Sequence, residues 1–146
     1  MNMANESLGA VMASEIAETP KVFRRILSNL AALEPIKDIL TVNKISSILI
    51  LARGTSDNAA HFLKYLVETK LGLPCGLTSP SSVTIYDAKL HYEGVLVVAL
   101  SQSGQSPDLV AFAKSAKSAG AKLISLTNDA NSPLAKAADH HLDLQA

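Results

Sequence analysis

Short apolar runs alternate with segments of helical periodicity along this chain, and this alternation constrains its fold more than any other feature. Two of the runs, Ile45–Ala52 and Gly94–Leu100, carry aliphatic residues at almost every position. Strands that are apolar on both faces are typical of parallel sheets covered by helices on both sides. The alternation therefore predicts βαβ units with right-handed crossovers and a mainly parallel sheet.

The fold class that follows is α/β, a three-layer α-β-α sandwich whose five strands lie in an order close to that of flavodoxin. The expected strands are Ile45–Ala52, Pro74–Thr78, Gly94–Leu100, Lys122–Thr127 and His140–Leu144. Helices are expected over 10–33, 57–70, 106–119 and 132–138, with a shorter one near 35–40 and a short helix or turn over 83–89. Pro20 is expected at the first turn of a new helix, with Thr19 as its cap. Residues 1–40 would form a helical lead-in, and 41–146 the sheet domain.

The chain has 146 residues, which fits one domain, and its 13 Lys and Arg residues balance 13 Asp and Glu residues. A neutral chain argues against a nucleic acid or a membrane surface as partner. The sequence shows no signal peptide and no apolar stretch near the ~20 residues that span a bilayer, so we expect a cytoplasmic protein. The single cysteine, Cys75, is interpreted as a small hydrophobic residue, not as a catalytic thiol.

One loop, Ser101-Gln102-Ser103-Gly104-Gln105-Ser106, carries the groups that a phosphate monoester needs. Ser101, Ser103 and Ser106 offer hydroxyl donors, Gln102 offers an amide, and Gly104 lets the backbone turn without a Cβ clash. The following helix directs the positive end of its dipole at the same place. A serine cap and a turn would be the simpler interpretation, but three hydroxyls around one glycine exceed what capping requires.

Other kinds of site find less support in the sequence. Neither G-x-x-x-x-G-K-[ST] nor G-x-G-x-x-G occurs, and no acidic pair or metal-ligand cluster is visible, so we expect no metal and no cofactor. His140 and His141 would point to opposite faces of a strand, which favours a structural role. His61 and His91 are lone histidines, of which His61 is closer to a strand end.

Two motifs resemble those of the sugar isomerase (SIS) domain family: L-A-R-G-T-S at Leu51–Ser56 and A-L-S-Q-S-G-Q-S at Ala99–Ser106. M-x-x-E-I at Met12–Ile16, followed by Pro20, resembles the helix that opens the isomerase part of glucosamine-6-phosphate synthase. Ala116–Asn128, together with Ser132–Leu134, is also similar. The resemblance covers nearly the whole chain from Met12 onward.

The resemblance implies roles for the matched positions. The residues that would hold a sugar phosphate are Ser101, Gln102, Ser103, Ser106 and Ser56, and those that would border the sugar are Gly54, Thr55, Gly104, Thr127 and Asn128. The ligand would be of the glucosamine 6-phosphate or fructose 6-phosphate class. Relatives of this kind also commonly associate, so we expect a homodimer.

The resemblance also implies an aldose–ketose isomerase or glucosamine-6-phosphate deaminase, which moves a proton between C1 and C2 with a carboxylate base. No such base is evident, because Glu68 and Glu93 are interpreted as surface charges, so no catalytic residue is assigned. We expect the N-terminal SIS half of a two-domain protein, without the glutaminase domain of the synthase. The alternatives are a SIS module that senses a sugar phosphate without turning it over, and an adaptor with no ligand.

Overall fold

The computed structural model describes residues 9–145; residues 1–8, the beginning of the expected lead-in, and Ala146 lie outside the described part. Its elements are α1 (Ala10–Ser28), the 3₁₀-helix η1 (Leu30–Leu33), α2 (Glu34–Val42), β1 (Ser47–Leu51), α3 (Ser56–Leu66), the π-helix η2 (Val67–Leu71), β2 (Cys75–Leu77), α4 (Ser81–Thr84), β3 (Val95–Leu100), α5 (Pro107–Ser118), β4 (Lys122–Thr127), α6 (Pro133–Ala137) and β5 (His140–Asp143).

The five strands form one sheet in the order β2-β1-β3-β4-β5, and every pair of neighbours is parallel. This is the flavodoxin-like order, so the predicted sheet is confirmed. Consecutive apolar residues in β3 serve both faces: Leu96 and Leu100 belong to one buried cluster, and Val97 and Ala99 to the other. This division explains why the strands have no polar alternation in the sequence.

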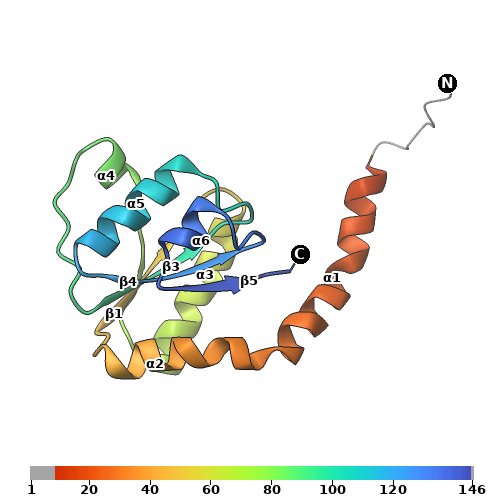
Figure 1. Ribbon diagram of the computed structural model, residues 1–146, viewed down its shortest axis with the longest axis horizontal. Coiled ribbons are helices and arrows are strands. Elements are labelled where there is room, and N and C mark those ends of the chain that lie inside the picture. Colours follow the sequence, from red (N-terminus) through yellow and green to blue (C-terminus); the bar gives the residue numbers. More distant parts are fainter. Residues whose placement is uncertain (1–8, 146) are drawn as a thin grey trace.

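Helices cover both faces of the sheet, which gives the three layers expected (Figure 1). On one face α5 and α6 bury Leu109, Phe112 and Leu134 against the sheet. On the other face α3 buries Ala60, and Ile36 and Ile39 of α2 pack against the same cluster. Burying a side chain of this size stabilises the fold by roughly 1.5–3 kcal/mol, so these helices are held by packing.

The prediction for Pro20 is wrong, because this residue lies inside α1, which runs from Ala10 to Ser28 without a break. Proline inside a helix removes one hydrogen bond and crowds the preceding turn, which is why a boundary was expected. The segments on both sides of Pro20 have helical periodicity, and the helix continues through it. After the last residue of α1, Ser28, the chain continues through Asn29 into the short 3₁₀-helix η1.

The predicted helix over 57–70 begins one residue earlier, at Ser56, and its last part, Val67–Leu71, is a π-helix. Gly72 ends it in the left-handed conformation, with a φ of 66°, as a glycine stop would predict. The predicted segment 83–89 is shorter and earlier than expected, since the helix there is only Ser81–Thr84.

Helix α1 extends away from the sandwich and buries none of its residues (Figure 1). Ile16, Phe23 and Leu27 are each more than 60% exposed on one side of it. None of the helices in residues 9–145 is both long enough and apolar enough to cross a membrane. The side of α1 that faces the strand ends contributes to the candidate site described below.

Candidate functional site

The loops that follow β1, β3 and β4 meet at the carboxyl-terminal edge of the sheet, where open parallel sheets bind ligands. The serine loop, residues 101–106, joins β3 to α5, and Ser56 begins α3 after β1. Ser56, Ser101 and Gln102 line one depression of about 200 Å³, which we call the serine-loop depression. The structure therefore brings together three residues that the sequence predicted from two separate motifs.

Backbone hydrogen bonds fix the serine loop on both sides. The Ser101 N–H donates to the Leu126 carbonyl (3.1 Å), and the Gln102 carbonyl accepts from the Asn128 N–H (2.9 Å). The Gly104 carbonyl accepts from the Leu134 N–H of α6 (3.2 Å). A loop held in this way does not have to order itself when a ligand binds, which lowers the entropic cost of binding.

The serine hydroxyls of the loop keep their protons for a ligand. Ser101 Oγ accepts from the Gly104 N–H (3.2 Å), and Ser103 Oγ accepts from the Gln105 N–H (3.3 Å). Each oxygen is an acceptor in these contacts, so each O–H can still donate. Ser106 occupies the N-cap position of α5, yet its side chain makes no capping bond. The simpler interpretation, a helix cap plus a turn, accounts for the bonds that Ser101 and Ser103 accept, but it does not use the donor protons of the three hydroxyls or the Ser106 side chain.

Gly104 is required by both the shape and the conformation of the loop. Its φ is 64°, and a Cβ built on it would lie 2.3 Å from Ser132 Oγ and 2.6 Å from Ser132 Cβ. Ser132 is fully buried, and its hydroxyl caps α6 by accepting from the Ala135 N–H (3.2 Å). The role of Ser132 as a support of the loop leaves no local pattern in the sequence, because the contact joins two loops that are distant along the chain.

An ion pair that was not predicted from the sequence links the first motif to the start of α5, directly after the second motif. Arg53 Nε lies 3.2 Å from Asp108 Oδ2, across the gap between the end of β1 and the first turn of α5. An unpaired carboxylate at this helix terminus would repel an anion, and Arg53 offsets that charge. Both side chains are partly exposed, so the pair itself contributes little to stability. Beside it, Gly54 has a φ of 64°, and the exposed Thr55 makes no side-chain cap.

Thr127 and Asn128, at the end of β4, differ in what they offer. The buried Thr127 hydroxyl donates to the Asp129 carbonyl (2.9 Å) and accepts from the Asp129 N–H (3.1 Å), so it is used inside the protein. Asn128 Oδ1 is buried and has no hydrogen-bond partner among residues 9–145. A buried acceptor without a donor costs about 1–3 kcal/mol, and this oxygen has no surface open to the depression unless the side chain turns.

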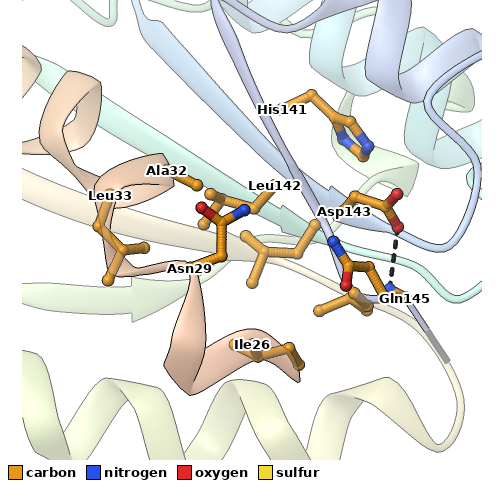
Figure 2. Close-up of a pocket in the computed structure, with 10 residues that line it drawn as sticks. Ile26, Asn29, Ala32, Leu33, His141, Leu142, Asp143 and Gln145 are labelled. Carbon is orange, nitrogen blue, oxygen red and sulfur yellow. Dashed lines mark hydrogen bonds between the residues drawn. The ribbon is translucent and has the colours of Figure 1, made fainter. Parts of the chain in front are cut away.

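Two further depressions continue from the serine loop toward the N-terminal helices. The helix-side depression, of about 570 Å³, is lined by Glu15, Glu18, Thr19, Val22, Phe23, Ile26, Gln102, Asn128 and Leu144. The edge depression, of about 350 Å³, lies between Ile26, Asn29 and Leu33 on one side and β5 with Gln145 on the other (Figure 2). The three depressions adjoin one another, since Leu144 lines all of them and Gln102 lines both the serine-loop and the helix-side depression.

The histidines belong to other parts of the structure. His61 and His91 are exposed. His140 Nε2 contacts the Ala32 carbonyl (3.0 Å), and His141 Nδ1 contacts Ser125 Oγ (3.1 Å), on opposite faces of β5 as expected.

The remaining candidate residues also have ordinary structural surroundings. Burial raises the pKa of the half-buried Cys75 thiol above its usual value, which disfavours the reactive thiolate. Glu93 precedes β3, and Glu68 lies in η2, the last part of the helical segment after β1, so both lie toward the opposite edge of the sheet. Glu68 is also paired with Lys64 (2.7 Å).

Residues 41–146 match the family model of the SIS domain, which is well over half of the chain. This chain belongs to the SIS domain family. Over 135 residues it is 36% identical to a glutamine–fructose-6-phosphate aminotransferase (isomerizing) from Clostridium acetobutylicum, with 88% of this chain and 22% of that protein covered. The predicted relation of this SIS domain to the isomerase part of such enzymes is confirmed.

Solved structures agree with this assignment. A provisionally assigned phosphosugar isomerase from Silicibacter pomeroyi DSS-3 is 39% identical, with a TM-score of 0.86, over 90% of this chain and 41% of that one. The C-terminal domain of glucosamine-fructose-6-phosphate aminotransferase from Francisella tularensis is 28% identical, with a TM-score of 0.78, over 92% and 39%. The chain thus spans 22–24% of the length of the curated relatives that it matches and about 40% of these two structures.

Proposed function

We propose that this SIS domain binds the phosphate group of a phosphorylated amino sugar or ketose in its serine loop. One observation carries the proposal: Ser101, Ser103 and Ser106 keep hydroxyl protons to donate at the N-terminus of α5. A phosphate monoester carries up to two negative charges and three acceptor oxygens, which such donors match. The helix terminus adds about half a positive charge at the same place, so no lysine is needed.

The class of sugar comes from the relatives. The curated relatives are named for fructose 6-phosphate, a ketose phosphate. Glucosamine 6-phosphate is the amino-sugar phosphate with the same number of carbons, and both belong to the predicted class of ligand. In this proposal Ser56 and Gln102 complete the phosphate contacts, and Gly54, Thr55 and Asn128 border the sugar. Gly104 and Thr127 shape the loop from behind, through Ser132 and Asp129.

We further infer that the chain is the N-terminal SIS half of an amino-sugar-phosphate isomerase or deaminase. Residues 41–146 would be the ligand-binding unit and residues 1–40 its helical lead-in. The family match, which begins at residue 41, supports this division. Proton transfer between C1 and C2 requires a base, and in this proposal neither Glu68 nor Glu93 is that base, because their elements place them toward the edge of the sheet opposite the serine loop.

A thermal-shift measurement tests the binding proposal. Glucosamine 6-phosphate or fructose 6-phosphate at about 100 times its Kd should raise Tm by about 5–10 °C, because ligand binding at that ratio adds about 2.7 kcal/mol. Glucosamine and fructose without phosphate are the matched controls and should shift Tm little. Equal shifts with and without the phosphate would refute a phosphate site.

We also propose that the chain forms a homodimer. Ile16, Phe23 and Leu27 expose an apolar side of α1, and a second copy of the same helix would cover it. Light scattering after size-exclusion chromatography should give about twice the chain mass of 15.4 kDa. The change Phe23→Glu should shift that mass toward the monomer, whereas Lys89→Glu on an exposed loop should not. A monomer at high concentration would contradict the proposal.

A further inference from the structure

We infer that the helix-side depression receives the sugar part of the ligand, and that Glu15 binds a positively charged amino group there. The inference rests on the proposed function, because it starts from a phosphate held by the serine loop. It adds an assignment that the motifs do not make. The protein group that distinguishes an amino sugar phosphate from a sugar phosphate without an amino group is a carboxylate on α1.

Continuity between the depressions gives the direction of the ligand. Gln102 lines both the serine-loop depression, with Ser56 and Ser101, and the helix-side depression, with Asn128 and Glu15. A molecule whose phosphate lies at Ser101 therefore has the helix-side depression as its neighbour on the other side of Gln102. That space, about 570 Å³, is within the range of small-ligand pockets.

Asn128 supplies evidence of a missing donor at this place. Its Oδ1 is buried without a hydrogen-bond partner among the described residues, while its backbone N–H is held by the Gln102 carbonyl (2.9 Å). Buried polar groups in folded proteins are nearly always paired. A turn of the Asn128 side chain would bring this oxygen to the depression, where a sugar hydroxyl or an ammonium group would supply the donor, because both are hydrogen-bond donors.

The charges in the depression indicate that the ligand carries a cation as well as an anion. Glu18 is neutralised by Arg25, at 3.2 Å, and Arg25 also donates to the Gln145 carbonyl. Glu15 has no ion-pair partner within residues 9–145, so the depression keeps one net negative charge. A carboxylate next to a phosphate site would disfavour a sugar phosphate that carries no positive group. It favours one that carries an ammonium group.

Calorimetric titration of the whole chain with two nearly isosteric ligands tests this inference. Glucosamine 6-phosphate and glucose 6-phosphate differ at C2, where one has an ammonium and the other a hydroxyl group. The unmodified chain should bind glucosamine 6-phosphate about 3–5-fold more tightly, the upper part of the range expected for one exposed charge contact. The change Glu15→Gln should remove this preference: the affinity for glucosamine 6-phosphate should fall, and that for glucose 6-phosphate should stay the same or rise, because a like charge is removed.

The control variant is Glu93→Gln, at the opposite edge of the sheet, and it should keep the preference. Circular dichroism should show that both variants keep the helicity and Tm of the unmodified chain. Glu15 lies on α1, which buries none of its residues, and Glu93 is exposed. Equal affinity of the unmodified chain for the two ligands, or an equal loss for both in Glu15→Gln, would overturn the role of Glu15 and leave the phosphate site intact. If neither ligand binds the unmodified chain, the proposed function itself fails.

Discussion

The change Gly104→Ala should lower the free energy of unfolding by about 2–5 kcal/mol and abolish measurable sugar-phosphate binding. Two physical terms add up at this position. A φ of 64° costs a residue with a Cβ about 1–2 kcal/mol. The new methyl group would also lie 2.3 Å from Ser132 Oγ, and overpacking of this kind costs about 1–3 kcal/mol.

Binding is lost because the loop can relieve the clash only by moving. Gly104 donates to Ser101 Oγ and its carbonyl accepts from Leu134, so a shift at residue 104 displaces the serine hydroxyl and separates the loop from α6. Urea denaturation would measure the stability change, and titration with glucosamine 6-phosphate would measure the loss of affinity.

Gly54 provides a matched control, since its φ is also 64° but a Cβ there would meet nothing within 4 Å. The change Gly54→Ala should therefore show only the conformational cost, about 1–2 kcal/mol. The difference between the two variants isolates the contact with Ser132. If both lose the same stability, the close packing of Gly104 on Ser132 is not what makes glycine necessary.

The sheet was predictable from the sequence because its strands are apolar on both faces. The bounds of β4, Lys122–Thr127, are those expected, and those of β3 differ by one residue. Local patterns of this kind depend on residues that are close in the sequence. Pro20 was misplaced because the rule that proline starts a helix is statistical, and here helical periodicity on both sides continues through it.

Only the part of the candidate site whose residues lie together in one motif was predictable from the sequence. The serine loop could be identified from its own residues, and the structure places it at the N-terminus of α5 as expected. The supports of the loop, Ser132 and the pair of Arg53 with Asp108, join separate loops and left no local signal. Glu15 likewise reaches the strand ends from a helix about 85 residues away from the serine loop.

The double change Ser101→Ala with Ser103→Ala should weaken binding of glucosamine 6-phosphate by at least about 100-fold. Each hydroxyl would donate one hydrogen bond to a charged oxygen, worth about 1.5–3 kcal/mol, so the loss of two is at least about 3 kcal/mol. Stability should fall by only about 1 kcal/mol, because the Gly104 N–H loses its acceptor on Ser101 while Ser103 is exposed.

The matched control for this variant is Ser115→Ala with Ser118→Ala, which removes two hydroxyls from the last turns of α5, away from the loop. It should bind the ligand like the unmodified chain. Full-strength binding by the Ser101 and Ser103 variant would mean that the phosphate is held elsewhere, for example by Arg53 alone. An equal loss of affinity for glucosamine 6-phosphate and for unphosphorylated glucosamine would also refute the site, because hydroxyls that recognise a phosphate must distinguish these two ligands.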